Sequence, residues 1–183
     1  MVHKRCVRIF LIIPILLFQL FTTINQADIN EDTLRFLMIN KIIPFVDWPA
    51  VSPGESDSSS PFIIGFTAQC PLMEMFKEYS KTHRIKNRKI MPIYIPDYND
   101  CVSCHILFIT SPQSWQLERI IRVVEDKPIL TLADGIDKAK HGVLISFIIE
   151  NNRFQLLLND CAAKSTRLRF SSYLKEYCKI VCY

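Results

Sequence analysis

Apolar residues in this chain recur in short uninterrupted runs, and between the runs they fall three or four positions apart. The clearest run is Ile106–Ile109, between the turn-forming segment 97–100 and Ser111-Pro112. A run without alternation predicts a strand buried on both faces, as in a parallel sheet. Similar runs predict five further strands, at residues 62–67, 90–95, 129–132, 143–149 and 154–159.

Segments with helical periodicity lie before and between these strands. The first begins near Asp28 or Asn30, either of which can cap a helix, and ends at Pro44. Pro71 suits the first position of a second helix. Further helices are predicted after Ser111-Pro112, briefly after Asp134-Gly135, and over residues 161–168 and 172–181.

This order of elements predicts an α/β fold, a three-layer sandwich with a mostly parallel sheet of about six strands. Asn151-Asn152 separates the last two strands. Asparagine tolerates positive φ, so this pair fits a two-residue hairpin turn. The sheet is therefore expected to end in an antiparallel C-terminal hairpin.

The first 27 residues have the order of a secretory signal peptide. Lys4, Arg5 and Arg8 precede an apolar run at residues 9–21, and Ala27 follows. The run is about 13 residues long, against about 20 needed to span a bilayer. We therefore predict a signal peptide at residues 1–27 and one α/β domain at residues 28–183.

Removal of this leader changes the charge of the chain. The full sequence has 22 basic and 18 acidic residues, and the three basic residues of the leader leave 19 against 18. A nearly neutral domain gives no general electrostatic reason to bind nucleic acid. We therefore predict no nucleic-acid partner.

Six cysteines follow the leader, and an even number in an exported chain suggests disulfides. The pair Cys101-x-x-Cys104 precedes a strand, whereas thioredoxin-type catalysis needs a helix N-terminus. Zinc ligation with Cys178 and Cys182 is an alternative, although export favours oxidation. Structural or redox-sensing disulfides fit best. The candidates are Cys70, Cys101, Cys104, Cys161, Cys178 and Cys182.

Three other residues are candidate ligand or partner contacts. Trp48 lies in a dense aromatic segment, where packing is the alternative role. Asp134 follows a strand at the end where α/β folds place ligand groups, although it also suits a turn. Asn159 ends the last strand. His105 abuts a buried strand and fits a core histidine. No serine elbow or phosphate loop occurs, so we predict neither an enzyme nor a cofactor.

An ordered set of short segments resembles the YfiR family of exported bacterial proteins. The set begins with Asn40-Lys41 and Asp47-Trp48-Pro49, and continues with residues 104–109 and 128–131 and with Asp134. It ends with residues 154–159 and 168–172, so the resemblance covers essentially the whole domain.

The resemblance implies a periplasmic regulatory protein, often dimeric, that binds and represses a membrane diguanylate cyclase of the YfiN type. Related domains are sensor modules of histidine kinases, so the sensor part of a kinase is an alternative partner. Redox change in the family's disulfides alters the repression. We expect the contact surface to include the first helix and the C-terminal segment. A small-ligand sensor with a cleft near Asp134 and a thiol oxidoreductase are the alternative functions.

The cysteine pattern departs from that of the family. Family members often carry a cysteine in the first strand facing the position of Cys104, where this chain has Ile64 or Gly65. If the last strand is antiparallel, Cys161 lies on the same edge of the sheet as Cys101 and Cys104. We therefore expect a bridge from Cys161 to one of those two.

Overall fold

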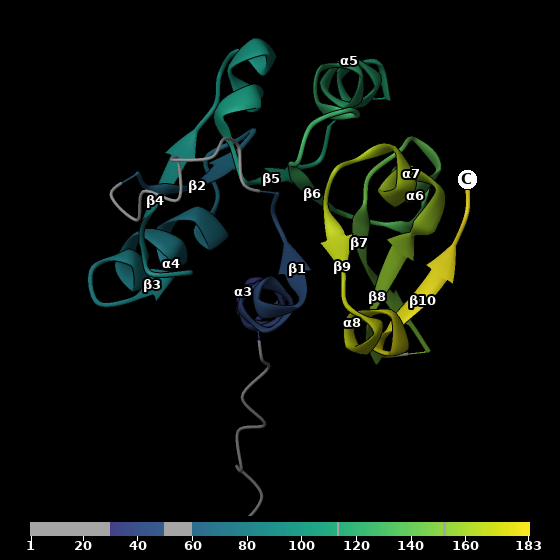
Figure 1. Ribbon diagram of the computed structural model, residues 1–183, viewed down its shortest axis with the longest axis horizontal. Helices are drawn as coiled ribbons and strands as arrows, with labels where there is room; N and C mark the ends of the chain where they lie inside the picture. The colour runs from purple at the N-terminus through teal and green to yellow at the C-terminus, as the bar shows by residue number, and fades with distance from the viewer. Residues whose placement is uncertain (1–29, 50–59, 113, 152) are drawn as a thin grey trace, which may run out of the picture. The chain divides into compact units, whose positions relative to one another are not determined.

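The computed structural model describes residues 30–49, 60–112, 114–151 and 153–183 (Figure 1). The predicted leader, residues 1–27, lies outside the described residues, as does most of the loop at 51–61. Residues Glu31–Tyr183 pack as one unit.

A sheet of eight strands lies at the centre of this unit. Its strands are β2 (Phe62–Phe66), β3 (Arg84–Ile85), β4 (Arg88–Tyr94), β5 (Ile106–Ile109), β6 (Leu130–Asp134), β7 (Ile145–Glu150), β8 (Arg153–Asn159) and β10 (Cys178–Val181). The spatial order is β10-β8-β7-β6-β5-β2-β4-β3. Strands β7, β6, β5, β2 and β4 are parallel, and β8 is antiparallel to β7. The predicted mostly parallel sheet is confirmed, with β3 and β10 as additional edge strands.

Strand β5 lies between β2 and β6, and all four of its residues are buried. Ile106 and Phe108 join the apolar core on one face of the sheet. Leu107 and Ile109 join the core on the other face. An apolar side chain at every position therefore supplies both cores at once, as the uninterrupted run predicts.

Helices cover both faces of the sheet. They are α3 (Glu31–Ile42), α4 (Pro71–Ser80), α5 (Ser114–Val124), α6 (Ile136–Lys140), α7 (Asp160–Ser165) and α8 (Ser172–Tyr177), with 3-10 turns η1 (Ile43–Phe45) and η2 (Tyr98–Ser103). Buried residues of α3, α4, α7 and α8 belong to the first core. Those of α5 and η2 belong to the second, and Figure 1 shows α4 and α5 on opposite sides of the sheet. The three-layer arrangement is confirmed.

The antiparallel β7–β8 hairpin is also confirmed. Its register pairs Glu150 with Arg153, so two residues connect the strands. Asn151 has a φ of 52°, a conformation that asparagine adopts more readily than most residues. The hairpin pairs Ile149 of β7 with Phe154 of β8, and both line a hollow together with residues of helix α3.

The C-terminal segment differs from the predicted helix over residues 172–181. Helix α8 ends at Tyr177, and β10 then pairs in parallel with β8. The short segment 178–181 ends in β-branched Ile180 and Val181, and the open edge of β8 supplies hydrogen-bond partners for a strand. A second small sheet pairs β1 (Val46–Asp47) with β9 (Arg169–Phe170). Pairing with the edge of β8 therefore makes residues 178–181 a strand, where local periodicity had predicted a helix.

Candidate functional site

One side of helix α3 borders two hollows in the protein surface. Glu31 and Arg35 line the first, and Met38 and Ile42 line the second. These positions are three or four residues apart, so they share one side of the helix. Phe154 lines both hollows. We call the combined area the α3–hairpin surface; it comprises Glu31, Arg35, Met38, Lys41, Ile42, Phe45, Asp134, Ile149, Glu150, Phe154, Tyr177 and Lys179.

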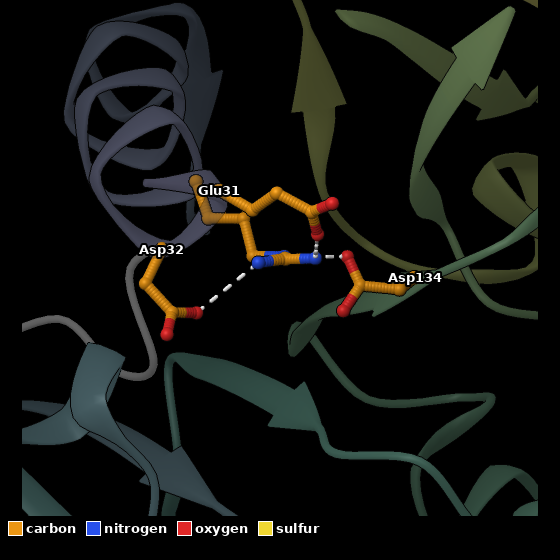
Figure 2. Close-up of polar contacts among 4 residues, drawn as sticks. Glu31, Asp32 and Asp134 are labelled. Atoms are coloured by element: carbon orange, nitrogen blue, oxygen red, sulfur yellow. Dashed lines mark hydrogen bonds and ion pairs between the residues drawn. The ribbon is translucent and has the colours of Figure 1, made fainter. Parts of the chain in front are cut away.

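Arg35 lines the first hollow, and Figure 2 shows Glu31, Asp32 and Asp134, the three carboxylates that its guanidinium contacts. Its Nε donates to Asp134 Oδ1 at 2.7 Å, its Nη2 to Glu31 Oε2 at 2.6 Å, and its Nη1 to Asp32 Oδ1 at 3.1 Å. Burial opposes the charge of Arg35, yet the hydrogen bonds to Asp134 and Glu31 hold its pKa above the usual value. Three carboxylates around one guanidinium leave this end of the surface negative.

These charges are positioned partly by neighbouring residues of α3 and partly by a residue far along the chain. Glu31 and Asp32 lie in the first turn of α3, where the helix dipole favours negative charge. Glu31 and Arg35 have the i,i+4 spacing of a helical ion pair. Asp134 comes from the carboxyl end of β6, 99 residues away from Arg35. Asp134 therefore ties α3 to the sheet, and the hollow beside it has a volume of about 360 Å³.

The second hollow is predominantly apolar and has a volume of about 250 Å³. Lys41 lies 5.1 Å from the ring centroid of Tyr177, and Lys179 lies 3.2 Å from Glu150. Tyr177 is 66% exposed, and Ile149 of the first hollow is 58% exposed. The α3–hairpin surface thus has an acidic end, an apolar middle and a basic end.

Trp48 lies elsewhere and is held by internal contacts. Its Nε1 donates to the carbonyl oxygen of His105 at 3.0 Å, and its ring meets Phe62 edge-on at 5.2 Å. The ammonium of Lys86 lies 5.4 Å from the ring centroid. These contacts give Trp48 a packing role, and it also lines two hollows of its own, so its part in ligand or partner contact stays a prediction. It does not line either hollow of the α3–hairpin surface.

Asn159 is fully buried, and each of its side-chain groups has a structural partner. Its Nδ2 donates to the carbonyl oxygen of Ala139 at 2.8 Å. Its Oδ1 accepts from the backbone N–H of Ala162 at 3.2 Å, which caps helix α7. The three candidates Trp48, Asp134 and Asn159 therefore occupy separate places, and only Asp134 belongs to the α3–hairpin surface.

His105 is a half-buried histidine with a lowered pKa. Its Nδ1 accepts from the backbone N–H of Ile63 at 3.1 Å, and its ring stacks on Phe62 at 4.6 Å. Burial, and then the charge of Arg88, lower its pKa to about 4. His105 is therefore neutral at physiological pH, and its Nδ1 accepts a hydrogen bond from the backbone of β2.

Cys161 forms its disulfide with Cys182, with Cα atoms 4.8 Å apart. The bridge expected from Cys161 to Cys101 or Cys104 is not the one formed. Strands β7 and β6 separate β8 from β5, and each strand adds about 4.8 Å. A disulfide needs Cα atoms within about 7 Å. Strand β10 instead runs beside β8, and so brings Cys182 to Cys161.

The other described cysteines are thiols in this structure. Burial, followed by the charge of Asp100, raises the pKa of Cys101 to about 11. Burial raises the pKa of Cys104 to about 12 and that of Cys178 to about 11. These thiols carry little thiolate at neutral pH, which disfavours nucleophilic thiol chemistry. Cys70 is partly exposed just before α4.

Among the described residues, no group of three or more His, Cys, Asp or Glu side chains is arranged to hold a metal ion. Cys182, a ligand in the zinc alternative, is in the disulfide. None of the described helices has the length and apolar character that crossing a membrane requires.

Sequence reasoning missed Arg35, the residue that organises the first hollow. Its spacing from Glu31 was a usable signal for an ion pair. No local pattern links Arg35 to Asp134 or Lys41 to Tyr177, because those contacts join segments far apart in the chain.

A model of the YfiR/HmsC-like family matches residues 32–176, from the first turn of α3 to the residue before the end of α8. A search of the curated proteins finds no match. The matched range contains most of the α3–hairpin surface.

Proposed function

Because this chain belongs to the YfiR/HmsC-like family, whose members are periplasmic regulators of diguanylate cyclases rather than enzymes, we propose that it binds and represses a membrane-bound diguanylate cyclase. The family match over residues 32–176 is the observation that carries this proposal. The bound part of the cyclase is its periplasmic sensor part, which requires export of this chain by its leader.

The α3–hairpin surface is the proposed contact area. It combines exposed Tyr177 and Ile149 with charges of both signs. Aromatic side chains seated beside a hollow are typical centres of binding energy in protein interfaces. Because Arg35 is held by three carboxylates, the acidic end of this surface is ordered before a partner arrives. Such preorganisation lowers the entropic cost of binding.

The charges indicate which partner segment fits. A basic side chain of the partner would lie near Glu31 and Asp134, and apolar side chains would enter the hollow beside Met38 and Phe154. An acidic side chain would lie near Lys41. Electrostatic complementarity of this kind fixes orientation and excludes wrong partners more than it adds affinity.

Deletion and complementation in the native cell test the regulatory function. Loss of this protein is expected to raise cyclic-di-GMP, and the wild-type chain is expected to restore the lower level. Unchanged cyclic-di-GMP after deletion would contradict the proposal. A pull-down from membranes then identifies the cyclase or, as the alternative, a sensor kinase.

A matched pair of variants tests the contact surface. Tyr177→Ala removes an exposed ring from the second hollow, whereas Tyr94→Ala removes an exposed ring from β4. Loss of an interface anchor costs about 2 kcal/mol or more, so Tyr177→Ala is expected to weaken cyclase binding more than tenfold. Tyr94→Ala is expected to bind as the wild type does. Equal binding by both variants would place the contact elsewhere.

The Cys161–Cys182 disulfide supports redox dependence of this repression. It fastens the end of β10, the strand that contributes Lys179 to the α3–hairpin surface. We expect a pull-down in reducing buffer to retain less cyclase than one in oxidising buffer. The expected homodimer stays a prediction, which light scattering of the purified protein would check.

A further inference from the structure

The charged residues in and beside the β3–β4 hairpin are all positive. Residues 79–96 contain five lysines and arginines and no aspartate or glutamate, although the whole domain is nearly neutral. Two residues, 86 and 87, connect the strands, so these charges are gathered around one short hairpin. A local excess of one charge in a balanced domain favours an anionic partner at that place. The five cations are Lys81, Arg84, Lys86, Arg88 and Lys89.

Three of the five cations have contacts within the protein. Glu78 pairs with Lys81. Arg88 is half-buried and donates only to uncharged groups, so it is a structural residue. Asp47 Oδ1 lies 3.5 Å from Lys86 Nζ, and the two side chains are 75% and 38% exposed. A long, exposed ion pair contributes little, so the ammonium of Lys86 stays available to another anion.

Arg84 and Lys89 are the two cations that lack an anion. The register of the hairpin places them directly opposite each other. Both are exposed, and within the described part of the chain neither side chain has a hydrogen bond or an ion pair. Like charges directly opposite in an antiparallel pair destabilise it, and their Cβ atoms are about 4.5–5.5 Å apart. One phosphate group between the two side chains would replace this repulsion by attraction.

The turn holds a further cation in an unfavourable backbone conformation. Lys86 has a φ of 49° and Asn87 a φ of 64°. Asparagine suits such a position, whereas lysine is disfavoured there. The hairpin therefore carries a positive charge at its tip at a local energetic cost. A cost of this kind is typical of functional positions, and it is independent of the repulsion between Arg84 and Lys89.

An exposed apolar side chain beside these cations indicates which anion fits. Met91 is 39% exposed and lies two residues after Lys89. Residues two apart in a strand share a face, as do residues directly opposite, so Met91, Lys89 and Arg84 lie on one face of the hairpin. Cations beside an apolar side chain suit a membrane surface, where headgroups meet the cations and the apolar group enters the interface. A polyanionic chain would leave Met91 in water.

We propose that the β3–β4 hairpin docks on the anionic phospholipid surface of a membrane. Phosphate groups lie between Arg84 and Lys89 and near Lys86, and Met91 enters the headgroup region. Strand β3 is at one edge of the sheet and β10 is at the other. The α3–hairpin surface, which includes Lys179 of β10, thus stays free for the cyclase. The docking rests on the charges of the hairpin and not on the identity of the partner, so it can fail without affecting the proposed repression.

Binding to vesicles tests the docking. The purified full chain is sedimented with vesicles of phosphatidylcholine alone, or of phosphatidylcholine mixed with phosphatidylglycerol. Three cations at about 1 kcal/mol each should make binding to the anionic vesicles about a hundredfold tighter. Raising the salt from about 0.1 M to about 1 M shortens the Debye length from about 10 Å to about 3 Å, so this preference should largely disappear. Equal binding to both kinds of vesicle at low salt would overturn the proposal.

Two double variants of equal net charge test the location. Arg84→Gln/Lys89→Gln should bind anionic vesicles about thirtyfold more weakly, the ratio that about 2 kcal/mol from two cations gives. Lys140→Gln/Arg153→Gln removes one lysine and one arginine that are also exposed, from α6 and β8. This control should bind as the wild type does. Equal losses in the two variants would mean that net charge alone acts, which contradicts an assignment to the hairpin.

A single charge reversal separates docking from a structural role. Lys89→Glu replaces the repulsion across the hairpin by attraction to Arg84, so the urea midpoint should rise or stay unchanged. Vesicle binding should nevertheless fall about thirtyfold, because the variant has two positive charge units fewer. Vesicle binding equal to that of the wild type would refute the docking.

Met91→Ser tests lipid against other polyanions. Binding to anionic vesicles should fall about fourfold, the ratio that about 0.8 kcal/mol for one buried CH₂ group gives. Retention on immobilised heparin depends on charge and should stay unchanged. Vesicle binding that is unaffected by Met91→Ser, or wild-type retention on heparin without any binding to vesicles, would assign the hairpin to another anionic partner and overturn the lipid proposal.

Discussion

Removing the Cys161–Cys182 bridge should weaken the fold by an amount that the structure allows to be calculated. The two cysteines are 21 residues apart in the sequence. In the chain-entropy model a 15-residue loop gives about 3 kcal/mol and a 100-residue loop about 4.7 kcal/mol. The bridge should therefore contribute about 3 kcal/mol to the free energy of unfolding. We expect the double variant Cys161→Ala/Cys182→Ala to lose this amount.

Urea and thermal unfolding measure the loss. For a domain of this size, 1 kcal/mol corresponds to about 2–4 °C in Tm, so a decrease of about 6–12 °C is expected. Wild-type protein in reducing buffer should unfold at nearly the same urea concentration as the double variant. Cys70→Ser is the control, because Cys70 is partly exposed and unbridged. It should change stability by no more than about 0.5 kcal/mol.

Two results would refute this reasoning. One is a double variant whose free energy of unfolding falls by less than about 1 kcal/mol, since the loop-closure term would then be absent. The other is a peptide map of the native protein that shows Cys161 and Cys182 as free thiols. Hydrogen exchange of β10 adds a local readout, because this edge strand should open first when the bridge is absent.

Three further predictions follow from the core. Gly65→Ala places a Cβ 2.5 Å from Cys104 Sγ, so it should cost about 1–3 kcal/mol in urea unfolding; unchanged stability would contradict the close packing. Iodoacetamide at pH 8 should label Cys70 well before Cys101 or Cys104, whose pKa values are raised to about 11 and 12; equal rates by mass spectrometry would disprove their burial. His105, with its pKa lowered to about 4, binds its proton more readily when unfolded, so stability should fall as pH drops from about 6.5 to 4. The slope should be smaller in His105→Asn, and identical slopes would count against this assignment.

Particular elements show how far sequence reasoning reached. The run Ile106–Ile109 predicted a strand buried on both faces, because side-chain alternation in a strand is a local property. Asn151 predicted the hairpin for a similar reason, since its conformation is set within the turn. The predicted helix over residues 172–181 was wrong beyond Tyr177, because the chain there joins the edge of β8 as strand β10.

The candidate site was likewise predictable from the sequence only in part. Asp134 was placed at the carboxyl end of its strand by the pattern of the chain, and the first helix and C-terminal segment were the expected contact area. That area still awaits a binding experiment. The partners of Asp134 were not foreseeable, because Arg35 reaches it from 99 residues away. Trp48 and Asn159 were chosen by type and position, and the structure gives both a packing or capping role.

Local patterns in the chain were enough to predict the alternation of strands and helices, the parallel core and the hairpin, because each depends on periodicities only a few residues long. The sequence also carried the family resemblance. The folded arrangement was needed to learn which cysteine bonds to Cys161, which carboxylates hold Arg35, and where the surface is hollow. Those features depend on strand order, and strand order sets the distances between segments that no local pattern records.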